Sequence, residues 1–447
     1  MRGVLLVCSW LLISTGSIAQ QKCGTELLAK RLAEKHPEVL QQVEKIREGN
    51  TPQTAAQQKT NAQNPIPVVF HIVLNEQQQK QIGGLAGIQQ RIDSQLAVLN
   101  RDFNARNADT SLIPNAFKPF ADNPNISFAL ARTAPDGSAT NGYTINTTSQ
   151  LGFLPEGGIG SGFGFSDAKY TTTGGKDVWD PSSYLNIWVI NPINEAGSNT
   201  LLLGLAIPYY YVVGNYGVSM NEMGVILHYR AFGRRVSPLD NYIASADLGR
   251  TLTHEVGHMF YLFHIWGDDE GKCPFNGGKD DGIYDTPMQA YSSNRCPSFP
   301  FTDGCTQSSP GIMYMNFMDY TDDVCVNMFT KGQVERMRNT IRQGEGMYPL
   351  TQHPELLVPP IGNTTTDNNF TIYPNPSDDH INILFAKQTT NLKSLHVVSL
   401  LGQVVATHKV EVQSSYYHFN LRSLQTGFYI LVMDFGNEKK VTKIMVQ

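Results

Sequence analysis

At 447 residues, the chain is long enough for two or three domains, one of them with a large hydrophobic core. A hydrophobic content of 41% and a charged content of 16% are typical of a globular protein rather than a disordered one. The formal net charge of −5 lacks the basic surplus that nucleic-acid-binding proteins usually carry, so we expect no nucleic-acid partner.

The first 19 residues have the features of a secretory signal peptide. Arg2 supplies the positive charge, residues 4–13 form an apolar run, and residues 17–19 (Ser-Ile-Ala) form a small-residue cleavage site. The alternative is a membrane anchor, but the apolar run is shorter than the ~20 residues that span a bilayer. We therefore expect a protein that is exported through the periplasm, secreted or attached to the cell surface, with no transmembrane segment.

Residues 20–62 are predicted to be a propeptide. The stretch from Glu26 to Glu48 is charged, carries leucine and valine at helical spacing, and is interrupted by Pro37. Residues 50–64 are rich in Gln, Asn and Thr, which is typical of a flexible linker. A short helical segment and a cleavable linker ahead of a larger domain are typical of a propeptide.

Residues 63–350 are predicted to form an α+β domain with a mixed sheet. The expected strands cover residues 66–74, 126–131 and 184–190, with an edge strand at 224–229. The expected helices cover residues 85–103, 245–263 and 330–344. The glycine-rich stretch 157–164 does not match a phosphate-binding motif and is interpreted as a loop. Residues 267–328 form a long loop that needs cross-links or bound ions to be ordered.

Within the helix predicted at 245–263, two histidines flank a glutamate in the pattern H-E-x-x-H. His254 and His258 lie one turn apart on the same face, so both imidazoles can reach one metal ion. Glu255 lies beside them, where a carboxylate can accept a proton from a water molecule. The alternative is an amphipathic helix with incidental histidines, but a third histidine, His264, argues against a chance occurrence of the pattern. Three neutral imidazoles leave zinc one open position for water, and zinc lowers the pKa of that water from ~15.7 to ~7.

The long loop contains four cysteines, and an exported chain favours two disulfides among them. They are Cys273, Cys296, Cys305 and Cys325. A four-cysteine zinc knuckle is the alternative, but no C-x-x-C pair is present. The sequence alone leaves three pairings open.

The three histidines and a later methionine resemble the metzincin class of zinc peptidases. The signature H-E-x-x-H-x-x-G-x-x-H is matched at every position except the glycine, which is replaced by Tyr261. Residues 316–320 (Asn-Phe-Met-Asp-Tyr) resemble the metzincin Met-turn. A non-glycine residue at position 261 costs roughly 1–2 kcal/mol if the left-handed backbone conformation is kept, so His264 depends on how this turn is built.

Within the metzincins, the chain most resembles the pappalysin family over about residues 65–345. The similar segments are residues 184–189, 252–258, 281–287, 316–323 and 329–333. The resemblance implies a secreted, zinc-dependent endopeptidase that hydrolyses protein or peptide substrates. It implies Glu255 as the general base, Met318 as the apolar floor beneath the metal, and Tyr320 as a hydrogen-bond donor to the oxyanion.

The same resemblance implies a calcium site, a disulfide pattern and a mechanism of latency. Asp281, Asp285 and Thr286 offer oxygen ligands for calcium, although the alternative is a solvated acidic loop. The implied pairs are Cys273 with Cys305 and Cys296 with Cys325. Cys23 is expected to bind the zinc and keep a zymogen silent; the alternatives are a stray thiol or an intermolecular disulfide.

Substrate preference and the third metal ligand leave alternatives open. Relatives favour arginine beside the scissile bond, which needs a carboxylate in the pocket; Asp322 and Asp323 are nearby, but Val324 follows them. A gluzincin-like enzyme with Glu270 as third ligand is one rival interpretation. An inactive surface adhesin that retains the fold is another, although such a protein would be expected to have lost Glu255 or a ligand.

Residues 351–369 are predicted to be a linker and residues 370–447 an all-β sandwich. Six short strand-like runs separated by turn residues support the sandwich, at residues 381–385, 395–399, 403–407, 416–421, 427–433 and 439–446. The segment resembles the sorting domain of type IX secretion in Bacteroidetes, at residues 373–376, 401–403 and 426–429 and at the lysines 439, 440 and 443. That resemblance implies the type IX secretion machinery as a partner. A carbohydrate-binding or adhesive module is the alternative.

Overall fold

The computed structural model describes most of the chain. The described residues are 23–49, 64–156, 162–193, 201–237, 240–268, 271–359, 370–373, 375–377, 379–385, 389, 391–400, 402–410, 413–414 and 416–446. The predicted signal peptide, most of the predicted linker at 50–64, residues 157–161 of the glycine-rich stretch, and Glu270 lie outside the described residues. In the described part of the chain, no helix has the length and apolar character needed to cross a membrane.

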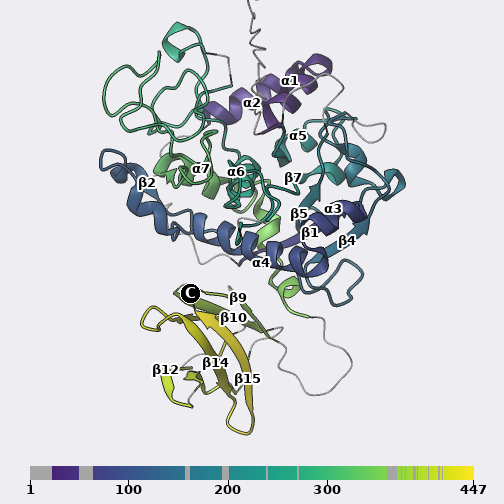
Figure 1. The fold of residues 1–447 in the computed structure, drawn as a ribbon, viewed down its shortest axis with the longest axis vertical. Coiled ribbons are helices and arrows are strands. Elements are labelled where there is room, and N and C mark those ends of the chain that lie inside the picture. The colour runs from purple at the N-terminus through teal and green to yellow at the C-terminus, as the bar shows by residue number, and fades with distance from the viewer. Residues whose placement is uncertain are drawn as a thin grey trace, which may run out of the picture.

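Two helices form the N-terminal segment, α1 (Thr25–Lys35) and α2 (Glu38–Glu48), separated at Pro37 as the sequence predicts. Each helix buries one apolar face against the rest of the chain. The buried side chains are Leu28, Leu32, Val39 and Val43. The two helices lie on the opposite side of the large domain from the C-terminal sandwich (Figure 1).

The large domain is built on a mixed sheet with the strand order β3-β1-β5-β7-β6, and β4 also pairs with β1. The strands are β1 (Ile66–Leu74), β3 (Phe128–Leu130), β4 (Tyr143–Thr147), β5 (Leu185–Ile190), β6 (Gly204–Ile207) and β7 (Gly224–His228). All pairings are parallel except that of β6 with β7. Every residue of β1 is buried, which agrees with its apolar character on both faces. The predicted α+β fold class is confirmed.

The position predicted for the edge strand is wrong by one strand. β7 was expected at the edge, but the short antiparallel strand β6 pairs with its free side and takes the edge position. The four residues of β6 are too few to give a periodic signal in the sequence. This difference bears on function, because the edge strand β6 is the strand that faces the histidine cluster described below.

The helices of the large domain are α3 (Glu76–Gln81), α4 (Gly84–Asp102), α5 (Tyr209–Val213), α6 (Arg250–Met259) and α7 (Lys331–Thr340). The histidine-bearing helix α6 is shorter than the 245–263 predicted. It starts after Gly249, whose φ of +82° breaks the helix, and it ends before Tyr261, whose φ is +67°. All ten of its residues are buried. Helix α7 begins with a capping box between Thr330 and Gln333.

The remaining elements of the large domain are short. They are the strands β2 (Ala121–Asp122) and β8 (Phe329–Thr330), and the 3-10 helices at Ala108–Leu112, Lys118–Phe120, Ser166–Lys169, Thr171–Thr173, Met220–Glu222, Pro274–Asn276, Tyr348–Thr351 and Pro354–Leu357. Leu357, within the predicted linker region, is fully buried.

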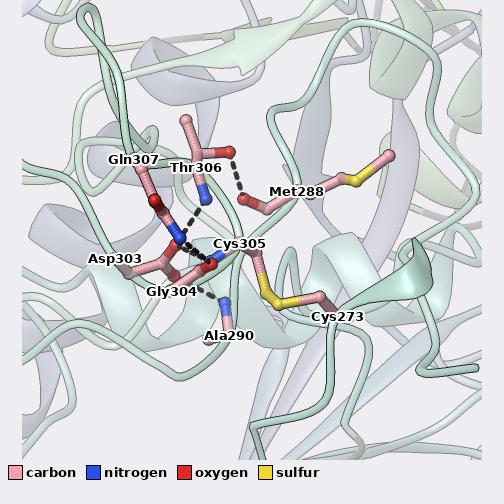
Figure 2. Close-up of a disulfide and its surroundings, with 8 residues drawn as sticks. All are labelled: Cys273, Met288, Ala290, Asp303, Gly304, Cys305, Thr306 and Gln307. Atoms are coloured by element: carbon pink, nitrogen blue, oxygen red, sulfur yellow. Dashed lines mark hydrogen bonds between the residues drawn. A yellow bond between two sulfur atoms is a disulfide. The ribbon is translucent and has the colours of Figure 1, made fainter. Parts of the chain in front are cut away.

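Cross-links hold the long loop after α6, as the sequence suggests. Cys273 pairs with Cys305 and Cys296 with Cys325, so the predicted disulfides are confirmed. Beside the first disulfide, the Asp303 carboxylate accepts hydrogen bonds from the backbone N–H groups of Ala290, Cys305 and Thr306 (Figure 2). In this loop, a side-chain carboxylate therefore satisfies backbone N–H groups that strand or helix pairing satisfies elsewhere.

The C-terminal segment forms two antiparallel sheets, β13-β10-β9 and β12-β11-β14-β15, and the predicted sandwich is confirmed. The strands are β9 (Phe370–Tyr373), β10 (His380–Phe385), β11 (Ser394–Ser399), β12 (Val404–Lys409), β13 (Tyr416–Asn420), β14 (Gly427–Asp434) and β15 (Lys439–Val446). The sandwich has its own apolar core and contacts the large domain through an Arg106–Asp379 ion pair of 3.1 Å.

Candidate zinc peptidase site

Helix α6 presents its two histidines and its glutamate because both of its ends are fixed. At its start, the Asp323 carboxylate accepts hydrogen bonds from the N–H groups of Leu248 and Arg250. The Arg250 side chain is buried and pairs with Asp102 and Asp109, which joins α6 to α4. The negative charge of Asp323 is favoured by the positive end of the helix dipole, and the buried ion pairs of Arg250 join α6 to its neighbours. Together these contacts fix the orientation of α6.

The turn after α6 is built with the left-handed backbone conformation despite the missing glycine. Tyr261 has φ +67°, and the N–H of Leu262 bonds back to the carbonyl of Gly257 at 3.1 Å. The Tyr261 ring packs edge-on against Tyr210, with 5.0 Å between ring centroids. The chain therefore reverses and brings His264 beside the other two histidines.

The three imidazoles converge on one point. The Nε2 atoms of His254, His258 and His264 are 3.1–3.2 Å apart, close to the ~3.3 Å expected around a tetrahedral zinc with bonds of ~2.0 Å. All three side chains are buried. Three ring nitrogens facing one another in a buried space repel unless a cation lies between them, so the donor set fits zinc.

Each ring is held by its other nitrogen. The Nδ1–H group of His254 donates to the Phe317 carbonyl at 2.7 Å, and that of His258 donates to the Leu262 carbonyl at 2.8 Å. The Nδ1–H group of His264 donates to the Asp268 carboxylate at 2.5 Å. These partners fix the tautomer that leaves each Nε2 lone pair free for a metal.

The predicted Met-turn lies directly beneath the histidines. Met318 is fully buried, and a Cβ on Gly257 of α6 would lie 2.5 Å from its sulfur. The Asn316 side chain accepts a hydrogen bond from the Met318 N–H at 2.9 Å. The centroid of the Tyr320 ring lies 5.0 Å from that of His264, so the ring packs against one of the three imidazoles.

Glu255 is completely buried between the histidines and β6. Burial raises the pKa of Glu255 to about 8, and hydrogen bonds from Cys23 and Thr25 oppose that increase. A Cβ on Gly204 would lie 2.5 Å from its Oε1 atom, so only glycine at this point of β6 leaves room for the carboxylate.

Cys23 completes the cluster from the N-terminal segment. Its Sγ and the ring nitrogens of the three histidines all lie within 4.8 Å of one another. Cys23 also forms a parallel bridge with Gly204, where the Gly24 N–H donates to the Gly204 carbonyl at 2.8 Å. The Tyr320 hydroxyl donates to the Cys23 carbonyl at 3.3 Å. The residues just before α1 therefore lie in the site and pair with β6 through one isolated bridge.

The residues predicted to bind calcium separate into two groups. Asp281 accepts hydrogen bonds at 2.9 Å from Thr286 Oγ1 and from the Ile283 N–H, and no hydrogen-bond partner is found for its buried Oδ2 among the described residues. Asp285 instead points to the start of α7, where it accepts from Thr330 Oγ1 at 2.6 Å and from the Gly332 N–H at 3.1 Å. Burial and the neighbouring Asp280 raise the pKa of Asp281 well above its usual range.

Sequence reasoning missed two residues of this site. Asp268 holds His264, but the turn between them is irregular and gives no periodic signal. Gly204 could be found only from its distance to Glu255. Glu270, the alternative third ligand, lies outside the described residues, and His264 occupies the third place in the cluster.

Family models and known proteins match both parts of the chain. A family described as pregnancy-associated plasma protein-A matches residues 170–342, and a secretion system C-terminal sorting domain matches residues 371–447. An extracellular metalloprotease of Arthroderma benhamiae is 41% identical over 97 residues, which is 22% of this chain and 31% of the relative. One of Verticillium alfalfae is 44% identical over 98 residues, which is 22% of this chain and 32% of the relative. The match thus spans about a third of the length of these curated relatives.

Two solved structures from Tannerella forsythia are similar over nearly their whole length. A promirolysin mutant is 37% identical with a TM-score of 0.60, covering 74% of this chain and 98% of that one. Mature mirolysin in complex with a cleaved peptide is 41% identical with a TM-score of 0.57, covering 67% of this chain and 100% of that one. The chain belongs to the pappalysin family of metallopeptidases and has a secretion-system sorting domain at its C-terminus.

Proposed function

We propose that this protein is a secreted zinc endopeptidase that is made as a zymogen. The observation that carries the proposal is the convergence of three Nε2 atoms, the Glu255 carboxylate and the Cys23 sulfur on one buried point. His254, His258 and His264 would hold the zinc, which when bound supplies a Lewis acid that polarises a peptide carbonyl and lowers the pKa of water.

The side chains around this point have the positions that peptide hydrolysis requires. Glu255 would accept the proton of the attacking water and pass it to the leaving amine. Tyr320 already donates to a backbone carbonyl, that of Cys23, and would donate in the same way to the oxyanion of the substrate. Met318 would keep the floor of the site apolar and fixed.

Latency would come from Cys23. Its thiolate would occupy the position that a water or substrate takes in the active enzyme, while its Sγ, 3.4 Å from Glu255 Oε2, also blocks the general base. The similarity to promirolysin and the sorting domain support export as a zymogen, with the type IX machinery as partner. Calcium would bind near Asp281 and Thr286, where the buried Oδ2 atom of Asp281 has no hydrogen-bond partner among the described residues.

Digestion of a peptide library by the purified chain, with and without a zinc chelator, tests the proposal. We expect cleavage by the processed enzyme that the chelator abolishes and added zinc restores. Replacing Glu255 by Gln should abolish cleavage while zinc content stays at one ion per chain. Chelator-resistant cleavage, or no cleavage after processing, would contradict the proposal.

A further inference from the structure

A cavity with an open volume of about 450 Å³ lies between the end of α4, the start of α6 and the loop that contains Arg234. A volume of this size accommodates a small organic ligand. The residues assigned above to the metal site do not line it. Its lining carries four arginines and two aspartates, a surplus of two positive charges. These residues are Arg101, Asp102, Arg106, Asp109, Arg234 and Arg250.

Both aspartates of the lining are already held by Arg250. The Asp109 carboxylate accepts from both terminal nitrogens of the Arg250 guanidinium, at 2.5 and 2.8 Å. Asp102 Oδ1 lies 3.5 Å from Arg250 Nη2, and Asp102 Oδ2 accepts from Thr253 Oγ1 at 2.7 Å. Arg250 is 7% exposed and Asp102 is 2% exposed, so this network belongs to the wall of the cavity. The positive surplus therefore comes from the other three arginines.

The rim of the cavity already binds one carboxylate, which comes from the C-terminal sandwich. Arg106 pairs with Asp379, the residue before β10, at 3.1 Å. Within the sandwich, Asp379 is also bound by Arg422 at 3.0 Å and by His380 at 2.6 Å. Asp379 therefore keeps two partners of its own domain when Arg106 turns to a ligand. An acid group fits at this rim, and Arg106 is the side chain for which a ligand and the sandwich compete.

Asn107 adds a hydrogen-bond requirement to the positive charge. It lines the cavity and is 5% exposed. Its Nδ2 group donates to Asp109 Oδ1 at 2.7 Å and to the Asn327 carbonyl at 2.9 Å, which fixes the amide. Its buried Oδ1 atom has no hydrogen-bond partner among the described residues. A buried acceptor without a donor is unfavourable, and a hydroxyl group is a neutral donor that satisfies it. The cavity therefore favours a ligand that carries hydroxyl groups as well as an acid group.

We propose that this cavity, the α4–α6 cavity, binds a small hydroxylated anion of the class of sugar acids and sugar phosphates. Arg101, Arg106 and Arg234 supply the positive charge for the acid group, and a ligand hydroxyl donates to Asn107 Oδ1. Side chains rather than a helix start provide this site, because the Asp323 carboxylate already accepts from the first N–H groups of α6. The site is separate from the peptidase site and does not depend on the function proposed for it.

The test measures binding to the full chain by calorimetry, with glucuronate and glucose 6-phosphate as probes and glucose as the uncharged control. We expect one-to-one binding of a charged probe, with a Kd below about 10 mM that rises with salt, and no binding of glucose. Inorganic phosphate should bind more weakly than glucose 6-phosphate, because it offers no sugar hydroxyl. Arg234 is exposed, so Arg234→Gln leaves the fold intact and should weaken binding about tenfold. The matched control is Arg132→Gln, since Arg132 does not line the cavity.

Asp379→Asn gives a second readout that leaves the cavity lining unchanged. It removes the carboxylate that competes for Arg106, so the charged probe should bind several-fold more tightly. Asp136→Asn, at an exposed aspartate elsewhere, should leave the affinity unchanged. Absence of binding of both charged probes to the parent and to Asp379→Asn would overturn the proposal. Unchanged affinity in Arg234→Gln, or inorganic phosphate binding as tightly as glucose 6-phosphate, would also overturn it. These results leave the peptidase function intact, because chelator-sensitive cleavage tests that function separately.

Discussion

Gly204→Ala is the most direct test of the place assigned to the general base. The added Cβ would lie 2.5 Å from Oε1, 2.6 Å from Cγ and 2.8 Å from Cδ of Glu255, whereas ordinary contacts begin near 3.4 Å. Relief of this overlap moves the carboxylate by about 1 Å, and a displacement of that size costs roughly 100-fold in rate. In free energy, the loss is about 2.7 kcal/mol of transition-state stabilisation.

The assay is kcat/KM of the processed enzyme on one peptide, together with zinc content and melting temperature. We expect the rate to fall roughly 100-fold while three intact histidines keep the zinc bound, with overpacking costing about 1–3 kcal/mol of stability. Gly304→Ala is the matched control, because no atom lies within 4 Å of its added Cβ. A Gly204→Ala enzyme within twofold of the parent would refute the position given to Glu255.

Further outcomes follow from individual contacts. Cys23→Ser should raise the peptidase activity of the uncleaved chain at least tenfold, measured before any N-terminal processing, since an alcohol is a poor zinc ligand. Asp281→Asn should diminish the rise in melting temperature that calcium gives the parent; an equal rise in both would exclude this site. Burial lowers the pKa of His71 to about 4, so its contribution to stability, complete above pH 6.5, is lost as the pH falls through about 4. His71→Gln should therefore flatten the pH dependence of unfolding by about 3 kcal/mol over that range. Arg250→Met should destabilise the fold by about 3–5 kcal/mol in denaturant unfolding, because buried carboxylates lose their partner.

Most of the metal site can be predicted from the sequence, because the helical spacing that places two ligands on one face involves only neighbouring residues. H-E-x-x-H places two imidazoles on one face of any helix, so His254 and His258 could be assigned without a fold. His264 required the resemblance to metzincins, since the turn that returns it depends on a backbone conformation that Tyr261 rarely adopts. The paired cysteines were likewise assignable only through the family.

What the sequence could not give are contacts made by distant segments. The edge strand β6 has four residues, too few for a period, yet it packs against Glu255 and pairs with the Cys23 segment. Asp268 reaches His264 through an irregular turn, and Arg47 reaches the Asp280 carbonyl across 233 positions of sequence. Such contacts depend on tertiary packing, which no local pattern encodes.

Tyr261 stands where the metzincin signature has glycine, and Gly346 leaves the space that its side chain needs. The left-handed conformation at Tyr261 costs roughly 1–2 kcal/mol, and an edge-on aromatic pair with Tyr210 returns about 0.5–1.5 kcal/mol beyond the area it buries. That packing needs space: a Cβ on Gly346 would lie 2.6 Å from the Tyr261 hydroxyl and 2.2 Å from the Tyr209 ring. Because Tyr210 also lines the hollow beside His258 and Phe263, the same ring contact connects the turn that carries His264 with the wall of that hollow. The change at position 261 therefore retains the metal site and adds an aromatic support to the hollow next to it.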